Sequence, residues 1–177
     1  MRLEHAHAKR RTLALEVRPR STGFVVFEGR ERALDWGVRK HRVRTSSLAT
    51  LLTRKICVLL DRYAPSAIVV RARKVRTKRA RRRIDVIMRV MRREAKRRAI
   101  AFQVVRPHAI RSFFSPHYCT TKREIAHLIA RWFPELSSKL PREQKIWKSE
   151  DHRMMLFDAA ATALAFLHTD AGREIRD

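Results

Sequence analysis

Cysteine is scarce in this 177-residue chain, which limits the scaffolds it can form. The two cysteines, Cys57 and Cys119, make neither a disulfide framework nor a CxxC pair, so we interpret both as structural thiols. The stretches HAH and HYC (residues 5–7 and 117–119) supply histidine and sulfur, but four zinc ligands at finger-like spacing are absent. The cysteine pattern indicates neither a disulfide-stapled scaffold nor a zinc finger.

Long apolar runs are absent as well. No segment reaches the roughly eighteen consecutive apolar residues that are typical of a membrane-spanning helix. The start of the chain, MRLEHAHAKRR, lacks the apolar centre of a secretory signal peptide. We therefore expect a soluble, intracellular protein of the cytoplasm that has no membrane partner.

Acidic residues are few: 17 Asp and Glu stand against 42 Lys and Arg, which gives a net charge of +25. A charge of this size attracts polyanions, and the planar guanidinium of arginine suits two-pronged contacts with phosphate. The expected partner is therefore nucleic acid, either DNA or RNA. The length is that of one domain with an ordinary core.

The spacing of apolar residues predicts an α/β domain. Short turns join three alternating segments, which predict an antiparallel meander over residues 12–17, 23–28 and 33–38. Two more strands are expected at residues 67–70 and 100–105. Helices are expected at residues 45–64, after the segment 71–83, from Thr121 with Glu124 in capping-box spacing, and at residues 150–168. We assign residues 1–11 to a flexible basic N-terminus, 12–168 to the domain and 169–177 to a C-terminal tail.

A basic segment, RARKVRTKRARRR (residues 71–83), carries Arg or Lys at nine of thirteen positions. Like charges at helical spacing repel one another and cost stability unless a counter-charge is present. A phosphate backbone is the natural counter-charge, and such contacts hold it without reading sequence. The predicted nucleic-acid-binding residues are Arg71, Arg73, Lys74, Arg76, Lys78, Arg79, Arg81, Arg82 and Arg83.

Two acidic residues lie in apolar surroundings at the two ends of the domain. Glu16 is in the middle of the first strand, LALEVR, and Asp158 opens the run DAAATALA in the last helix. Together with Thr22-Gly23 at the start of the second strand and the order of the elements, these features resemble the RuvC-type Holliday junction resolvases of the ribonuclease H-like superfamily. The resemblance covers roughly residues 12–168. It implies a mixed five-stranded sheet, with three antiparallel strands followed by two parallel ones, flanked by helices.

The resemblance also implies a chemistry for these acids. In that family the first-strand carboxylate faces the last helix, where paired acids hold magnesium against the scissile phosphate. Two magnesium ions about 4 Å apart can activate a water and stabilise the leaving oxygen. Glu16 and Asp158 are therefore the candidate catalytic and metal-binding residues, with Mg²⁺ as cofactor if the site is active and none otherwise. Asp151, two turns before Asp158, is a further candidate, and its alternative role is to complement the dipole of the last helix.

The chain departs from the family at three positions. Glutamate replaces aspartate at residue 16, and its longer side chain moves the ligand oxygens. The family places a glutamate at the end of the central strand, where this chain reads VVR (residues 69–71), and no acid occurs from residue 62 to 84. A further acid expected one turn before Asp158 is replaced by Met154 or Met155. We expect Arg71 to face the same cleft as Glu16 and Asp158, to pair with them, and to close the site to metal.

Three functions remain open on the sequence. The main hypothesis is a RuvC-like protein that binds structured or branched nucleic acid through its phosphates, with an impaired or altered nuclease site. The alternatives are an active magnesium-dependent, structure-selective endonuclease and a structural RNA-binding component of a ribonucleoprotein. Resolvases of this family act as dimers because a four-way junction has two-fold symmetry, so the resemblance raises the prospect of a homodimer. Trp147, in a polar stretch, is a candidate for stacking on unpaired bases.

Overall fold

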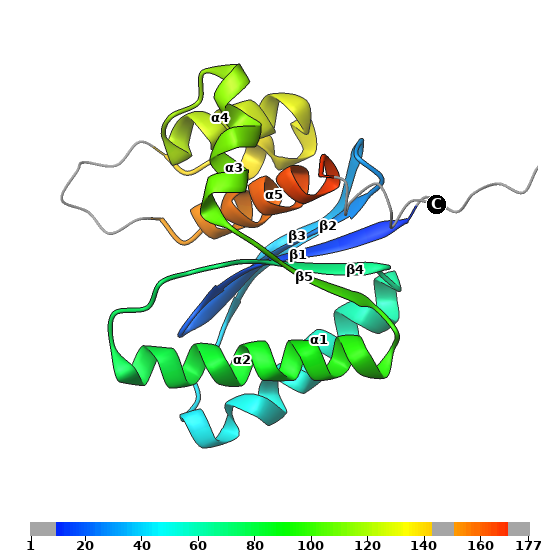
Figure 1. The fold of residues 1–177 in the computed structure, drawn as a ribbon, viewed down its shortest axis with the longest axis vertical. Coiled ribbons are helices and arrows are strands. Elements are labelled where there is room, and N and C mark those ends of the chain that lie inside the picture. Colours follow the sequence, from blue (N-terminus) through cyan, green and yellow to red (C-terminus); the bar gives the residue numbers. More distant parts are fainter. Residues whose placement is uncertain (1–9, 143–150, 170–177) are drawn as a thin grey trace, which may run out of the picture.

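The computed structural model describes residues 10–142 and 151–169, and these form one layered α/β unit (Figure 1). A five-stranded sheet has the strand order β3-β2-β1-β4-β5. Its elements in chain order are β1 (Arg11–Arg18), β2 (Ser21–Glu28), β3 (Arg32–Lys40), α1 (Leu48–Tyr63), β4 (Ala67–Arg71), α2 (Lys78–Arg97), β5 (Ala101–Val105), α3 (Pro107–Phe114), α4 (Lys122–Trp132) and α5 (Met154–Leu167). Among the described residues, no helix is both long and apolar enough to cross a membrane.

The pairing of the strands confirms the predicted sheet. The first three strands are antiparallel neighbours, whereas β4 pairs in parallel with β1 and β5 in parallel with β4. Helices α1 and α2 cover one face of the sheet, and α3, α4 and α5 lie over the other (Figure 1). The sheet therefore has a hydrophobic core on each side.

Strand β1 is buried on both faces, which explains its nearly continuous apolar sequence. Leu13 and Leu15 join the core under α1 and α2, whereas Ala14 joins the core under α5. Because side chains alternate along a strand, Glu16 falls on the same face as Ala14, toward α5. Because Glu16 is two residues from Ala14, it is buried on the same side of the sheet as Ala14.

Helix α5 lies close against the sheet because its residues are small and one strand residue has no side chain. All of α5 after Met154 is buried. Gly23 on β2 pairs directly with Glu16, and a Cβ added there would lie 2.6 Å from the carbonyl oxygen of Met155. The glycine therefore permits the close approach that brings α5 over Glu16.

Local sequence signals explain the ends of several helices. The capping box predicted at Thr121 and Glu124 is present in full at the start of α4. Thr77 caps α2 by accepting a hydrogen bond from the backbone N–H of Ala80. The last helix differs from the prediction, because it begins at Met154 rather than at residue 150. Asp151 accepts the backbone N–H of Arg153 instead, and this local bond competes with helix formation.

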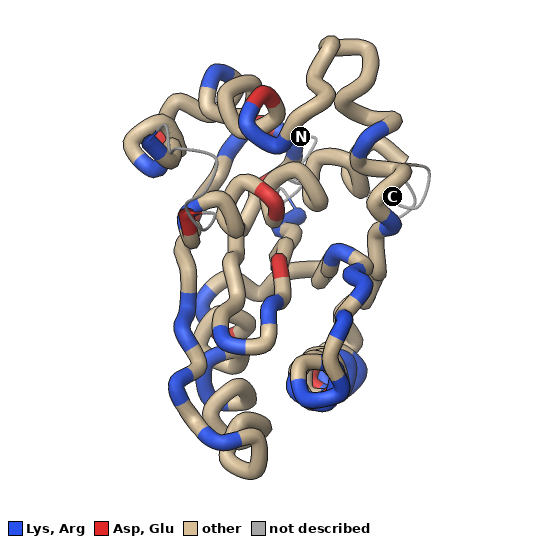
Figure 2. The backbone as a smooth tube through the Cα atoms, turned by 90° about the vertical axis from the view of Figure 1, so that its left-hand side faces the viewer, with Lys and Arg blue, Asp and Glu red and all other residues tan. Residues whose placement is uncertain are grey.

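Positive charge is spread over both the helical layers and the sheet (Figure 2). On α2 the residues that join the hydrophobic core are Ile87, Val90, Met91 and Ala95. The remaining faces carry exposed Arg and Lys. The helix is thus amphipathic with a strongly cationic outer surface.

Candidate functional site

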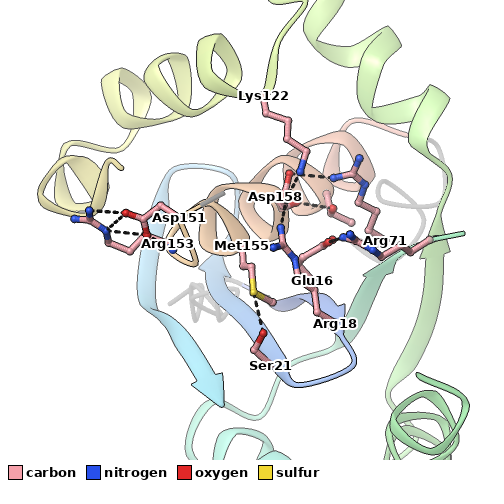
Figure 3. A network of polar contacts seen from close by, with 11 residues as sticks. Glu16, Arg18, Ser21, Arg71, Lys122, Asp151, Arg153, Met155 and Asp158 are labelled. Atoms are coloured by element: carbon pink, nitrogen blue, oxygen red, sulfur yellow. Dashed lines mark hydrogen bonds and ion pairs between the residues drawn. The ribbon is translucent and has the colours of Figure 1, made fainter. Parts of the chain in front are cut away.

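Three elements bring the predicted site residues together (Figure 3). Glu16 projects from β1 and is fully buried, Asp158 projects from α5 and is 6% exposed, and Arg71 ends β4. The expectation that Arg71 faces both acids agrees with this geometry. We call these three residues, together with the cations that contact them, the Glu16–Asp158 cluster.

Asp158 is held by cations from three different elements. Its Oδ1 accepts a hydrogen bond from Arg71 Nη1 at 3.0 Å, and its Oδ2 accepts one from Lys122 Nζ at 2.9 Å. Arg18, on the same face of β1 as Glu16, adds an ion pair at 3.5 Å. Both carboxylate oxygens are therefore already engaged by positive charge.

Glu16 has a different partner from the one predicted. Its Oε1 accepts a hydrogen bond from Arg73 Nη1 at 2.7 Å, while its Oε2 is buried without a hydrogen-bond partner among the described residues. Burial raises the pKa of Glu16, and the neighbouring charge of Asp158 raises it further. The charges of Arg71, Arg73 and Arg18 act in the opposite direction. Arg71 thus pairs with Asp158 and stabilises Glu16 only through its charge.

The cluster carries an excess of positive charge. Four cationic side chains, Arg18, Arg71, Arg73 and Lys122, surround two carboxyl groups. Arg73 and Lys122 are about two-fifths exposed, so the outer side of the cluster presents cations to solvent. Such an arrangement attracts an anion rather than a metal ion.

The residues present do not fit a magnesium site. Mg²⁺ requires near-octahedral oxygen ligation, yet a guanidinium stands at the end of β4 and binds Asp158. Met155 is buried one turn before Asp158, and its sulfur accepts a hydrogen bond from Ser21 Oγ at 3.3 Å. The part of the chain that the structure describes contains no group of three or more His, Cys, Asp or Glu residues placed to hold a metal.

Asp151 does not join the cluster. Its carboxylate forms an ion pair with Arg153 at 2.6 Å, and this hydrogen-bonded partner lowers the pKa of Asp151. Figure 3 shows the pair at a distance from Glu16 and Asp158. The candidate role of Asp151 as a ligand therefore has no support from its position, and it precedes α5 rather than lying in its first turn.

The basic segment separates into exposed and buried residues. Arg71 is partly buried, and the remaining residues apart from Arg83 are exposed, namely Arg73, Lys74, Arg76, Lys78, Arg79, Arg81 and Arg82. Between residues 73–76 and the start of α2 lies an open hollow of about 990 Å³, lined by Arg73, Lys74, Arg76 and Arg81 together with Val75, Ile84 and Asp85. These residues are available to a polyanion.

Arg83 differs from its exposed neighbours because its side chain is buried, and its contact with nucleic acid stays a prediction. It is 7% exposed, and its guanidinium donates to the carbonyl oxygens of Pro19 at 2.7 Å, Val43 at 2.9 Å and His41 at 3.3 Å. The β1–β2 turn and the β3–α1 connection place these carbonyl groups outside the strands, and Arg83 supplies them with hydrogen-bond donors. It is a structural residue that ties α2 to two loops.

The sequence predicts one of the other two contacts of Asp158 but not the second. Arg18 follows Glu16 by two residues, so strand alternation already places it on the same face. Lys122 carries no such signal, because it comes from α4, 36 residues before Asp158. Trp147, the candidate for base stacking, lies outside the described residues.

Comparison with known proteins gives structural but not sequence matches. No family profile and no curated protein sequence matches the chain. The structure of T. thermophilus RuvC in complex with a Holliday junction substrate is similar, with a TM-score of 0.71 and 15% identity over 92% of this chain and 97% of that one. Yeast mitochondrial Holliday junction resolvase Ydc2 is similar with a TM-score of 0.62 and 14% identity, over 93% of this chain and 82% of that one. This chain therefore has the ribonuclease H-like fold of the RuvC-type Holliday junction resolvases.

Proposed function

We propose that this protein binds structured nucleic acid, with branched DNA as the favoured ligand, and does not hydrolyse it by the two-metal route. The observation that carries the proposal is the pairing of Arg71 with Asp158 at the end of β4. A guanidinium at this place supplies positive charge to a phosphate but cannot ionise a bound water, as a metal ion does. The site keeps its affinity for phosphate and loses its nucleophile.

Two further observations support the binding of a backbone. The similar RuvC structure is a complex with a Holliday junction substrate. The exposed arginines and lysines from residue 73 onward flank the Glu16–Asp158 cluster, because Arg73 contacts Glu16 directly. A strand that places one phosphate at the cluster therefore runs along a cationic surface. Contacts of this kind hold a backbone in register without reading its sequence.

A second candidate function, the magnesium-dependent endonuclease, is favoured by one observation. Glu16 and Asp158 are gathered in one buried cluster, as they would be in a nuclease, and Glu16 keeps an oxygen without a hydrogen-bond partner. Such an enzyme would have to displace Arg71 and Lys122 from Asp158 before metal could bind. A cleavage and binding experiment on a four-way junction separates the two functions.

The test uses a labelled four-way junction and a linear duplex of the same sequence. We expect the protein to bind the junction more tightly than the duplex without added metal, and to leave it uncut when Mg²⁺ is added. Sedimentation of the complex gives the number of copies bound, and two copies would match the two-fold symmetry of the junction. Magnesium-dependent cutting that disappears in Asp158→Asn would establish the nuclease instead. Equal affinity for structured RNA, with ribosomal RNA carried through purification, would favour the ribonucleoprotein role.

A further inference from the structure

A second basic hollow lies outside the segment from which nucleic-acid binding was predicted. Its volume is about 710 Å³, and it forms where the β1–β2 turn, the β3–α1 connection and the first turns of α2 meet. We call it the His41 pocket. Among the described residues its lining contains no acid and consists of Arg20, Ser21, Val38, Lys40, His41, Arg42, Val43, Arg44, Thr45, Arg79, Arg83 and His152.

Two buried side chains give the pocket a fixed floor. Arg83 is held by the carbonyl oxygens of Pro19, Val43 and His41. His41 is 2% exposed, and its Nε2 lies 2.8 Å from Thr22 Oγ1. Its Nδ1 is buried and has no hydrogen-bond partner among the described residues. The floor thus combines a fixed guanidinium with a ring nitrogen that lacks a partner.

The described part of the pocket rim is cationic. Arg20, Arg42, Arg44 and Arg79 are exposed, and within the described ranges none of these side chains forms an ion pair. Burial lowers the pKa of Arg83, and the nearby charges of Arg20 and Arg79 lower it further. This repulsion among cations is relieved when an anion enters.

We propose that the His41 pocket binds a phosphate group of a nucleic-acid strand. Arginine side chains offer paired donors that match phosphate oxygens, and the volume lies within the range of about 300–1,000 Å³ typical of sites that enclose a small organic ligand. The pocket therefore has room for a nucleotide around the phosphate. Its assignment to a strand, rather than to free phosphate, rests on the proposed function.

The pocket lies beside the Glu16–Asp158 cluster. Ser21 lines the pocket and also donates its hydroxyl to Met155, one helical turn from Asp158. A strand that enters the pocket can therefore continue toward the cluster. Burial, together with the charges of Lys55 and Arg83, lowers the pKa of His41 to about 4, so the ring is neutral at pH 7.

The test replaces three exposed rim residues and leaves the buried floor and α2 intact. The pocket variant is Arg20→Gln, Arg42→Gln and Arg44→Gln. The control variant, Arg54→Gln, Arg62→Gln and Arg131→Gln, removes the same charge from exposed positions that do not line the pocket. The probes are inorganic phosphate, a short oligothymidylate with and without a 5′-phosphate, and the four-way junction. Imidazole NMR signals of His41 report entry into the pocket.

In the unmodified protein and the control variant, we expect inorganic phosphate and the oligonucleotide to shift the His41 signals in a saturable manner. In the pocket variant this shift should be lost, and junction affinity should fall about tenfold or more at low salt. A requirement for the 5′-phosphate would assign the pocket to a strand end, whereas equal binding without it would assign it to the internal backbone.

The outcomes separate the two proposals. If the pocket and control variants bind the junction equally and His41 does not respond to phosphate, the pocket proposal is wrong while the proposed function stands. If the unmodified protein binds no nucleic acid, the proposed function is wrong. A phosphate-dependent shift of His41 would then still support the pocket as a site for free phosphate.

Discussion

Arg71 donates a hydrogen bond from Nη1 to Asp158 Oδ1 at 3.0 Å. It does so from the end of β4, where the resemblance to the resolvases implied a metal-binding carboxylate. Replacing Arg71 by Glu supplies a third acid, and replacing Glu16 by Asp shortens the side chain at residue 16 to the length usual in the resolvases. The double variant should therefore gain affinity for Mg²⁺. Calorimetric titration of Mg²⁺ into both proteins measures this gain, and circular dichroism verifies that the variant folds. The matched control is Glu16→Asp alone, which retains Arg71.

The unmodified protein and the control should bind Mg²⁺ weakly or not at all. Millimolar or tighter binding by the unmodified chain would contradict the closed site and favour the nuclease. Cleavage by the double variant should stay low even with metal bound, because Met155 still occupies the place of a further acid.

His41 makes the stability of the fold depend on pH. Its pKa is about 4 in the folded protein against an ordinary value of 6.5, so the unfolded chain binds the additional proton first as pH falls. Stability from this residue is complete above pH 6.5 and is lost between pH 6.5 and 4. After a reduction for solvent screening at the pocket mouth, we expect a loss of about 1–2 kcal/mol. Urea denaturation at several pH values measures it, and His41→Gln should remove this part of the dependence. An unchanged profile in that variant would assign the acid sensitivity to other groups.

At the scale of elements, α5 is positioned by the absence of a side chain on β2. A methyl group at Gly23 would meet the backbone of Met155 at 2.6–2.7 Å, and backbone cannot move away at low cost. We expect Gly23→Ala to lower the free energy of unfolding by about 1–3 kcal/mol or more, as other overpacked cores do. Gly37→Ala is the comparison, because its added methyl meets only the edge of the Phe24 ring at 3.1 Å. Urea denaturation measures the free energy of unfolding of both variants. If both lose the same amount, the close approach of α5 to Gly23 is not the cause of the loss.

Helix α2 carries two kinds of arginine, and substitutions should distinguish them. Changing the exposed Arg79, Arg81 and Arg82 to Gln should flatten the slope of log affinity against log salt by about 2–3 units, because each neutralised phosphate contributes about 0.9. Changing the buried Arg83 to Gln should instead lower the free energy of unfolding by about 1–3 kcal/mol, since buried carbonyl groups lose their donor. Salt-dependent binding and urea denaturation measure the two effects. An unchanged slope in the triple variant would place α2 outside the interface.

For the whole molecule, a net charge of +25 opposes the compact state. Raising salt from ~0.01 M to ~0.15 M shortens the screening length from about 30 Å to about 8 Å. We expect the melting temperature to rise by ~2–4 °C, which corresponds to about 1 kcal/mol for a chain of this size. Adding the four-way junction at constant ionic strength should raise it further, because a ligand that binds only the folded state stabilises it. A melting temperature that falls with salt would show that ion pairs outweigh the repulsion.

The sequence by itself determined the order of the five strands and of helices α1, α2, α4 and α5, together with the faces that they bury. Periods of 2 and 3.6 are local properties, as is the capping box at Thr121, so they can be recognised without knowledge of the fold. The lack of any acid from residue 62 to 84 likewise already indicated that the end of β4 offers no carboxylate. The excess of positive charge at the end of β4 could therefore be predicted from the sequence.

Only the tertiary structure decided which charges meet. Arg71 and Asp158 are 87 residues apart, and Arg73 and Glu16 are 57 apart. Within a run of nine basic residues the pattern does not say which guanidinium reaches which acid, or that Arg83 is buried while Arg82 is exposed. These outcomes depend on where β1, β4, α2 and α5 lie relative to one another, and that arrangement is set by the packing of both cores. Charge could be counted along the chain, whereas pairing required the distances between elements that are remote in sequence.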